Sequence, residues 1–218
     1  MKKLRALFRK WFVNTYIWAA ELLYHNLAWA YDNVSWLVSF GYWPQWRLDA
    51  LQYLISGAVL ETGFGTGSLL IEMTERGLDV IGLELSSQMQ RVTSRKLSRR
   101  DVAVKRVLGR TEALPFPGRK FMNVLSTFPS NYIFDDETCK EAHRVLDKSG
   151  RWVILGLGMN FKSGIKKRLT KWLWGDWDEG LMPHLVEKFI SAGFSLSFIR
   201  HETDQYVLPI LILEHHDG

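Results

Sequence analysis

Three glycines at alternate positions mark the part of this sequence with the clearest capacity to bind a ligand. They stand at positions 63, 65 and 67, in the stretch ETGFGTG of residues 61–67, between two apolar runs. Glycine has no side chain, so the backbone there can pass close to a bound molecule. One carboxylate, Glu61, precedes the glycines, and a second, Glu84, closes a later apolar run. Such a turn could hold a phosphate, a dinucleotide or an adenosine-bearing sulfonium.

The spacing of the glycines separates these three ligand classes. A Walker phosphate loop needs a lysine directly after its last glycine, but Ser68 follows Gly67. The dinucleotide fingerprint needs glycine at its first, third and sixth positions, and the sixth position counted from Gly63 is Ser68. The sequence therefore excludes a Walker loop, disfavours a nicotinamide or flavin oxidoreductase, and leaves the sulfonium as the best match.

Several later segments support the sulfonium interpretation, and they occur in the expected order along the chain. Residues 61–67 resemble motif I of the class I S-adenosylmethionine-dependent methyltransferases, in which an acidic residue precedes alternating glycines. Four later stretches of this chain resemble the segments that follow motif I in the family. They are Glu84-Leu85-Ser86 with Met89, then residues 109–116 (GRTEALPF), 121–124 (FMNV) and 144–151 (RVLDKSGR). The resemblance extends over residues 57–157.

This resemblance implies a methyltransferase enzyme with S-adenosyl-L-methionine as its cofactor. The acidic residue of motif I would pair with the cofactor's ammonium group, and the acidic residue after the second strand would accept hydrogen bonds from the ribose. A sulfonium methyl group is already activated, so no catalytic side chain is implied. The implied cofactor-binding residues are Glu61, Thr62, Gly63, Gly65, Thr66, Gly67, Glu84, Leu85, Ser86, Met89, Arg110, Thr111, Glu112, Thr127 and Tyr31.

Two positions depart from the family pattern. Arg110 stands where an aspartate usually accepts a hydrogen bond from the adenine amine, and Asn123 replaces another common aspartate. Arginine cannot accept a hydrogen bond. Either the backbone near Thr111 and Glu112 holds the adenine, or Arg110 stacks on its ring. The alternative is a non-catalytic relative that keeps the fold after losing the cofactor site.

The methyl acceptor is expected near the end of the fourth predicted strand, because ligands of open α/β sheets bind at the carboxyl ends of the strands. Phe128, Pro129 and Tyr132 follow that strand and are the predicted acceptor-binding residues, together with Tyr31 as a lid residue. The segments 31–33, 39–41 and 46–47 are similar to the opening of the ubiquinone/menaquinone C-methyltransferases, to which bacterial phospholipid N-methyltransferases are related. The resemblance implies a lipophilic acceptor: a quinone precursor, a phospholipid amine or another lipid.

The amino-acid composition favours a location on the surface of a membrane. The formal net charge is +5, and the 10 tryptophans cluster early and late in the chain. Residues 161–177 have an apolar face flanked by lysine and arginine, a pattern typical of a helix lying in a bilayer interface. With the basic residues 1–31, they predict attachment to an anionic membrane surface from the cytoplasmic side. The single cysteine fits a reducing compartment, the histidines lack metal-ligand spacing, and nucleic acid is disfavoured.

The site requires strands and helices in alternation, and the chain supplies them. Helices are expected at 4–31, 47–55, 68–76, 88–100, 137–146 and 181–192, and strands at 58–61, 79–84, 102–108, 121–127, 151–157, 195–201 and 206–214. The alternation predicts a Rossmann-like α/β fold, with a seven-stranded, mostly parallel, doubly wound sheet and an antiparallel final pair. Residues 1–50 form a predicted helical lid, and residues 51–218 form the predicted methyltransferase domain with an insertion at 161–177.

Overall fold

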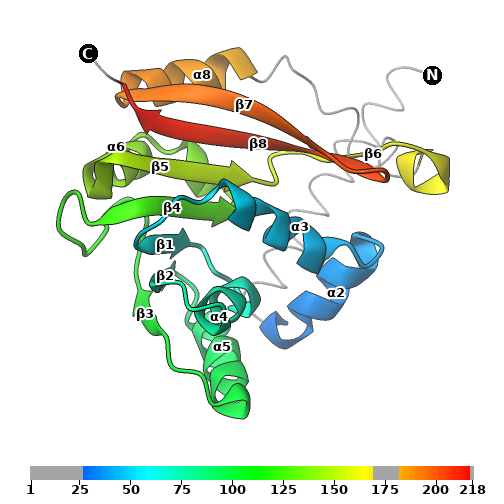
Figure 1. Ribbon diagram of the computed structural model, residues 1–218. Coiled ribbons are helices and arrows are strands. Elements are labelled where there is room, and N and C mark those ends of the chain that lie inside the picture. Colours follow the sequence, from blue (N-terminus) through cyan, green and yellow to red (C-terminus); the bar gives the residue numbers. More distant parts are fainter. Residues whose placement is uncertain (1–26, 169–181, 217–218) are drawn as a thin grey trace.

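The computed structural model describes residues 27–168 and 182–216. The predictions for residues 1–26 and for the second half of the 161–177 insertion lie outside these ranges. At the centre of the described part is a sheet of eight strands, with β7 beside β8 and the other strands in the order β3-β2-β1-β4-β5-β8-β6 (Figure 1). The strands are β1 (Val59–Thr62), β2 (Val80–Glu84), β3 (Lys105–Leu108), β4 (Phe121–Thr127), β5 (Leu146–Leu155), β6 (Asn160–Phe161), β7 (Phe194–Glu202) and β8 (Tyr206–His215).

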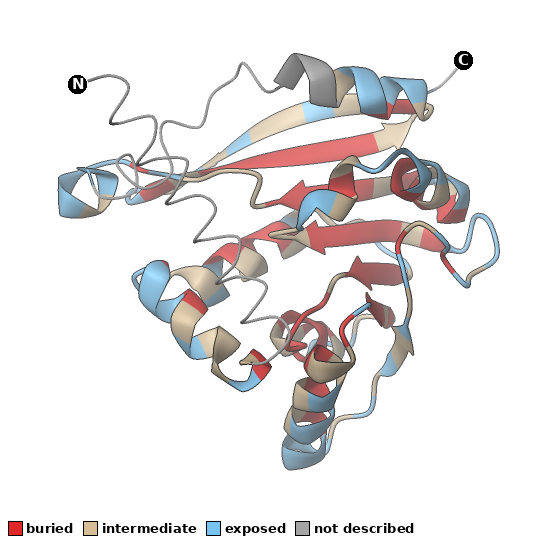
Figure 2. Cartoon of the chain, turned by 180° about the vertical axis from the view of Figure 1, so that it is seen from behind, coloured by how far each residue is buried: buried red, intermediate tan, exposed pale blue. Residues whose placement is uncertain are grey.

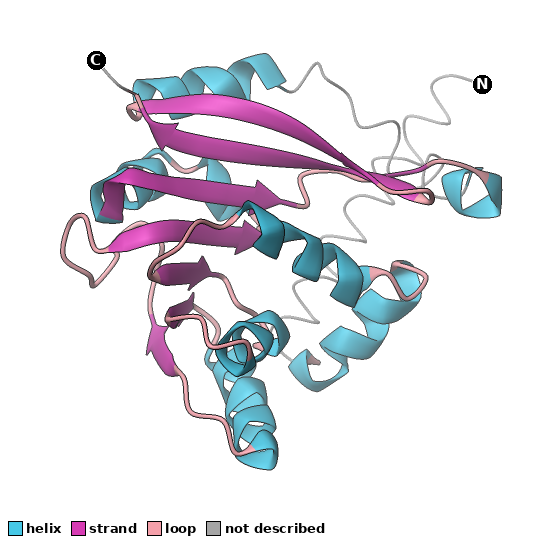
Figure 3. Ribbon diagram, viewed as in Figure 1, coloured by secondary structure: helices cyan, strands magenta, loops and turns pink. Residues whose placement is uncertain are grey.

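The predicted doubly wound, mostly parallel sheet is confirmed. Strands β1 to β5 run parallel, and β8 runs antiparallel between β5 and β7. The helices alternate with the strands, as Figure 3 shows. They are η1 (Ala28–Ala30), α2 (Tyr31–Val38), α3 (Trp43–Asp49), η2 (Ala50–Tyr53), α4 (Ser68–Glu75), α5 (Ser87–Arg100), η3 (Asn131–Phe134), α6 (Asp136–Val145) and α8 (Met182–Ser191).

The core consists of two apolar layers, one on each face of the sheet. Val59 belongs to the layer under α3 and α4, whereas its neighbour Leu60 belongs to the layer under α6 and α8. Successive side chains of a strand point to opposite faces, so a strand covered on both sides must be apolar throughout. The central strands β1, β2 and β4 are accordingly mostly buried, whereas β3 and β7 are only partly buried (Figure 2).

Local sequence explains where the helices around the glycine turn begin. Ser86 is the N-cap of α5, and its Oγ accepts a hydrogen bond from Met89 N at 3.3 Å. Gly67 is the N-cap of α4 and adopts a φ of 71°, a left-handed conformation that favours glycine. Asp101 ends α5 in the same conformation. The caps therefore fix the ends of the two helices that flank the turn.

Several boundaries differ from the predictions, and three of them have a clear physical reason. Helix α3 begins at Trp43, not at Arg47, because Pro44 occupies its first turn, where a helix needs no N–H donor. Strand β5 begins at Leu146, not at Arg151, since Leu146 pairs with Phe121 and an irregularity absorbs the intervening residues. The short β6 raises the strand number above the predicted seven, because two residues pair with the start of β8.

Two searches of the described residues gave no candidates. No helix in 27–168 and 182–216 is long and apolar enough to cross a lipid bilayer. Within the same ranges, no group of three or more histidine, cysteine or acidic side chains is arranged to hold a metal ion.

Candidate functional site

The glycine turn joins β1 to α4 at the carboxyl edge of the sheet. Gly63, Gly65 and Gly67 all have positive φ angles, of 66°, 56° and 71°. A Cβ atom at Gly67 would lie 2.3 Å from the Thr93 methyl group, so this glycine allows α5 to pack closely. A Cβ atom at Gly65 would meet no atom within 4 Å. The turn is therefore bare at Gly65 next to open space, where a ligand can lie against the backbone.

Glu84, at the end of β2, is bound to this turn. Its Oε2 accepts a hydrogen bond from Gly65 N, and its Oε1 accepts one from Ser86 N, both at 2.8 Å. Burial raises the pKa of Glu84, although the backbone N–H bonds act in the opposite direction. Each carboxylate oxygen keeps a second lone pair, so Glu84 can still accept hydrogen bonds from ligand hydroxyl groups.

Of the carboxyl groups at the turn, Glu61 has the fewest interactions that would stabilise its ionised form. Its side chain is 1% exposed, and its Oε2 has no hydrogen-bond partner among the described residues. Burial raises its pKa to about 8; the positive charge of Arg47 opposes this rise, and the negative charge of Glu84 adds to it. Glu61 therefore retains its proton at neutral pH unless a cation approaches it. A ligand ammonium group is such a cation.

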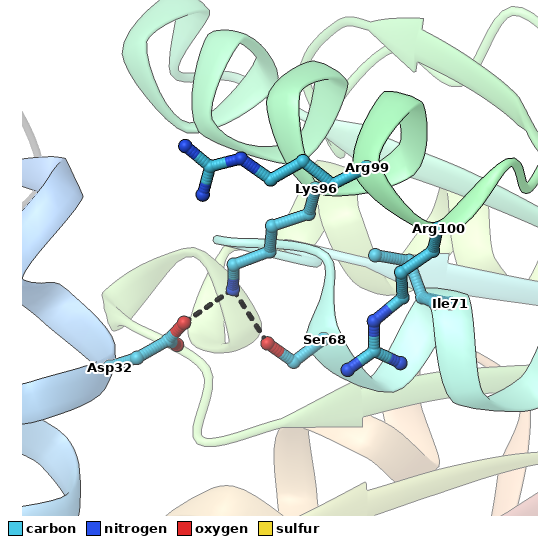
Figure 4. Close-up of a pocket in the computed structure, with 6 residues that line it drawn as sticks. All are labelled: Asp32, Ser68, Ile71, Lys96, Arg99 and Arg100. Carbon is cyan, nitrogen blue, oxygen red and sulfur yellow. Dashed lines mark hydrogen bonds and ion pairs between the residues drawn. The ribbon is translucent and has the colours of Figure 1, made fainter.

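The N-terminal helix α2 is held to the turn by a polar cluster. Asp32 accepts hydrogen bonds from Thr66 Oγ1 at 2.6 Å and from Lys96 Nζ. Lys96 Nζ also donates to Ser68 Oγ at 2.7 Å (Figure 4). Burial alone would raise the pKa of Asp32, but the bonds from Lys96 and Thr66 outweigh it and lower the pKa. The cluster joins α2 to α4 and α5, beside a pocket of about 300 Å³.

Arg47, on α3, is a charged residue that the sequence did not single out as a site residue. Its Nε is buried and has no hydrogen-bond partner among the described residues. Burial lowers the pKa of its guanidinium group, and the nearby Asp32, Glu61 and Tyr31 favour its charged form. The only sequence signal was its place in the Trp46-Arg47 pair of the N-terminal resemblance.

Aromatic side chains surround the predicted acceptor position. The rings of Trp43 and Phe128 stack with centroids 4.0 Å apart and an interplanar angle of 25°. Tyr31 meets Trp43 edge-to-face, with centroids 6.3 Å apart. Phe128 has a φ of 48°, which is unusual for a residue with a large side chain. Strained backbone directly after a central strand occurs often in active sites.

Tyr132 closes the other side of the turn. Its hydroxyl donates a hydrogen bond to Thr62 O at 3.0 Å and lies 2.9 Å from where a Cβ of Gly63 would be. Burial raises the pKa of Tyr132 to about 12, so the hydroxyl remains protonated at neutral pH. Thr62 Oγ1 in turn lies 2.6 Å from Ser126 Oγ on β4. The β1 and β4 ends are thus linked under the acceptor position.

The remaining predicted cofactor residues divide between rim and interior. Arg110 forms an exposed ion pair with Glu112 at 3.0 Å, and Leu85 is 60% exposed. Thr111 is turned inward, with its Oγ1 3.1 Å from Thr138 Oγ1, and Met89 is fully buried. Thr127 and the predicted acceptor residue Pro129 are half-buried at the end of β4.

Asn123, the second departure from the family pattern, has a structural position. Its Oδ1 accepts a hydrogen bond from Ile55 N at 2.9 Å, and its Nδ2 donates one to Ile55 O at 2.8 Å. The side chain is fully buried under the segment that leads into β1. Asn123 therefore anchors this segment to β4, which explains an amide in place of a carboxylate.

Known proteins that resemble this chain in sequence include methyltransferases. A family described as "Methyltransferase domain" matches residues 59–150. The demethylmenaquinone methyltransferase of Thermus thermophilus is 31% identical over 139 residues, which cover 61% of this chain and 63% of that protein. The ubiquinone/menaquinone biosynthesis C-methyltransferase of Geotalea uraniireducens is 29% identical over 142 residues, or 61% of this chain and 60% of the relative. The aligned region thus spans less than two thirds of either relative.

A solved structure shows the same fold over most of the chain. It is a Methanococcus maripaludis protein assigned to the S-adenosyl-L-methionine-dependent methyltransferases. The TM-score is 0.63 at 16% identity, and the alignment covers 88% of this chain and 93% of that one. At this identity the likeness concerns the fold alone.

Proposed function

Because this chain belongs to the class I S-adenosyl-L-methionine-dependent methyltransferases, we propose that it transfers a methyl group from this cofactor to a lipophilic small molecule. The observation that carries the proposal is the turn after β1. There Gly65 faces open space, and two buried carboxyl groups, Glu61 and Glu84, flank the turn. This combination suits a ligand with a cationic end and neighbouring hydroxyl groups.

The residues of the turn fit the cofactor. When bound, S-adenosyl-L-methionine supplies a methyl group activated by its sulfonium centre. Glu84 would accept hydrogen bonds from the ribose hydroxyls, and Glu61 would pair with the ammonium group through its unpartnered Oε2. Arg110 is paired with Glu112 in solvent, so the neighbouring backbone would have to hold the adenine. Methyl transfer then depends on aligning the acceptor and excluding water more than on a specific acid or base.

An aromatic wall supports a lipophilic acceptor. Trp43 contacts both Tyr31 and Phe128, which directly follows β4, and the three rings offer flat apolar surface. The two relatives are named as methyltransferases of menaquinone and ubiquinone biosynthesis, so a quinone precursor is the first acceptor to test. A phospholipid amine and other lipids remain in the proposed acceptor class.

Calorimetry tests the assignment directly. The full chain should bind S-adenosyl-L-methionine in a one-to-one titration, and it should label a quinone-precursor substrate with radioactive methyl groups. A chain that binds the cofactor and labels neither quinone precursors nor membrane lipid extract would contradict the acceptor class. A chain that gives no heat with the cofactor would be the non-catalytic relative, and the methyltransferase proposal would fail.

We also propose that the enzyme works at the cytoplasmic face of an anionic membrane, with residues 1–50 as a lid over the domain of residues 51–218. Support comes from exposed apolar side chains at the end of α2: Trp36, Leu37 and Val38 are 57%, 68% and 54% exposed. Ile165, in the described half of the 161–177 insertion, is 79% exposed. Basic residues 166–168 follow it directly and suit anionic lipid headgroups.

Liposome sedimentation tests this location. The chain should sediment with anionic vesicles and should do so less at high salt, because the charge attraction is screened. Leu37→Glu should reduce the bound fraction severalfold, whereas Ser98→Glu, on the exposed side of α5, should match it in charge without this loss. Equal binding by both variants would rule out the α2 surface as a membrane contact.

A further inference from the structure

Among the described residues, Arg47 is a half-buried positive charge without a hydrogen-bonding partner. Arg47 forms no hydrogen bond with any residue in the described ranges, and its Nε is fully shielded from solvent. A guanidinium group has five N–H donors, and burying it unpaired costs free energy. A carboxylate or phosphate that approached its free N–H donors would offset this cost through charge-assisted hydrogen bonds.

Asp32, an acidic side chain from the same N-terminal region, is bonded to other residues. Both carboxylate oxygens of Asp32 already accept hydrogen bonds, one from Thr66 and one from Lys96. Arg47 is within electrostatic range of Asp32 but is not bonded to it. Asp32 therefore secures α2 to the turn, and the donors of Arg47 remain available to another anion.

Glu61, the second acidic neighbour of Arg47, has an acceptor atom without a hydrogen-bond donor. Glu61 Oε2 is buried without a partner, and Arg47 and Glu61 influence each other's pKa. No direct hydrogen bond joins the two side chains. A donor and an acceptor without hydrogen-bond partners therefore lie within electrostatic range of each other, and Glu61 stands two residues before Gly63 of the turn. A ligand that carries both an anion and a cation on adjacent atoms satisfies both.

We propose that Arg47 binds the carboxylate of the amino-acid end of S-adenosyl-L-methionine, opposite Glu61, which binds its ammonium group. This inference rests on the proposed function and adds a residue of α3 to the cofactor site. The guanidinium fork suits a carboxylate because two parallel N–H donors can meet its two oxygens. Helix α3 thereby couples the lid region to the cofactor: binding neutralises the buried charge of Arg47 and fixes the helix that also carries Trp43.

A ligand series isolates the carboxylate. Calorimetry with the full chain would use three ligands: S-adenosyl-L-methionine, its decarboxylated analogue, and 5′-methylthioadenosine, which lacks the whole amino-acid end. Arg47→Met should raise the Kd of S-adenosyl-L-methionine about 10- to 100-fold, as expected for losing a charge-assisted hydrogen bond. It should change the Kd of the other two ligands less than about threefold, since neither carries the carboxylate.

Two further variants serve as controls. Arg47→Lys keeps the charge but loses the fork, so its Kd for S-adenosyl-L-methionine should fall between those of the unsubstituted chain and R47M. It also keeps the experiment informative if R47M folds poorly. Arg151→Met removes another half-buried arginine whose Nε has no partner. Arg151 is paired with Glu214 on β8, so this variant should leave all three Kd values within about twofold.

The outcomes separate the inference from the proposed function. If R47M weakens all three ligands equally, or leaves S-adenosyl-L-methionine binding unchanged, the carboxylate assignment is wrong while the methyltransferase proposal stands. If the unsubstituted chain binds none of the three ligands, the proposed function fails and the inference fails with it. A selective loss for the carboxylate-bearing ligand is the expected result.

Discussion

Glu61 offers a substitution whose effect can be worked out from its pKa. The carboxyl group has an ordinary pKa of 4.5, and burial raises it to about 8 in the fold. Between these two values the folded chain holds a proton that the unfolded chain has released. Stability therefore falls as the pH rises through this window, and the loss is complete above about pH 8. Glu61→Gln keeps the shape of the side chain and removes the titration.

The size of the effect follows from proton linkage. Each pH unit inside the window costs about 1.4 kcal/mol of unfolding free energy. At pH 7 the pH exceeds the ordinary pKa of 4.5 by 2.5, so the cost to the native sequence is about 3 kcal/mol. Because a buried site relaxes when it ionises, this is an upper bound. E61Q should thus be more stable than the native chain by up to about 3 kcal/mol at pH 7, and by almost nothing at pH 4.5.

Urea unfolding at several pH values measures this difference. The native chain and E61Q would be unfolded at pH 5, 6, 7 and 8, and the difference in unfolding free energy plotted against pH. Glu72→Gln is the matched control, because Glu72 is half-exposed on α4 and paired with Arg76. Its effect should stay within about 0.5 kcal/mol at every pH.

The same variant should lose affinity for the cofactor. An ionised Glu61 is needed to pair with an ammonium group, so E61Q should bind S-adenosyl-L-methionine about 10-fold or more weakly while folding more stably. Binding to the native chain at pH 7 should release a proton, which calorimetry in two buffers of different ionisation heat detects. A stability difference that does not change with pH, or cofactor binding that is unaffected in E61Q, would refute this account of Glu61.

Three further substitutions separate effects on cofactor affinity from effects on packing and stability. Gly65→Ala should fold with a loss of about 1 kcal/mol and should weaken cofactor binding about 10-fold, because its methyl group enters open space at a positive φ. Gly67→Ala should cost about 3 kcal/mol, since its Cβ would lie 2.3 Å from Thr93, and chemical denaturation measures both losses. Asn123→Ala should lower stability by about 2 kcal/mol through its two lost bonds to Ile55, with cofactor affinity unchanged by calorimetry.

Much of the fold was predictable because it depends on local patterns. The alternation of apolar strands with helices predicted the mostly parallel sheet, and α4 and α5 match the expected helices 68–76 and 88–100 to within one residue. The boundaries that failed depended on longer-range pairing. Leu146 extends β5 because Phe121 on the neighbouring strand is free to pair with it, and no pattern within residues 146–150 announces that partner.

The site divides in the same way. Glycine spacing and the positions of Glu61 and Glu84 were sufficient to predict a cofactor turn, because both follow directly from strand ends. The stacking of Trp43 on Phe128 and the approach of Arg47 to Glu61 were not predictable. Each joins α3 to a strand end far along the chain, and the sequence does not state how a helix outside the repeating β-α pattern packs on the sheet.

The sequence by itself determined the kind of molecule: where the strands end, where the backbone is bare, and which carboxyl groups stand beside it. Only the tertiary structure decided the charge state of that site. Glu61 holds its proton because the surrounding core removes water, and Arg47 forms no hydrogen bond with Asp32, which is bonded to Thr66 and Lys96 instead. Both properties are sums over atoms from distant segments, so they exist only once the chain has folded.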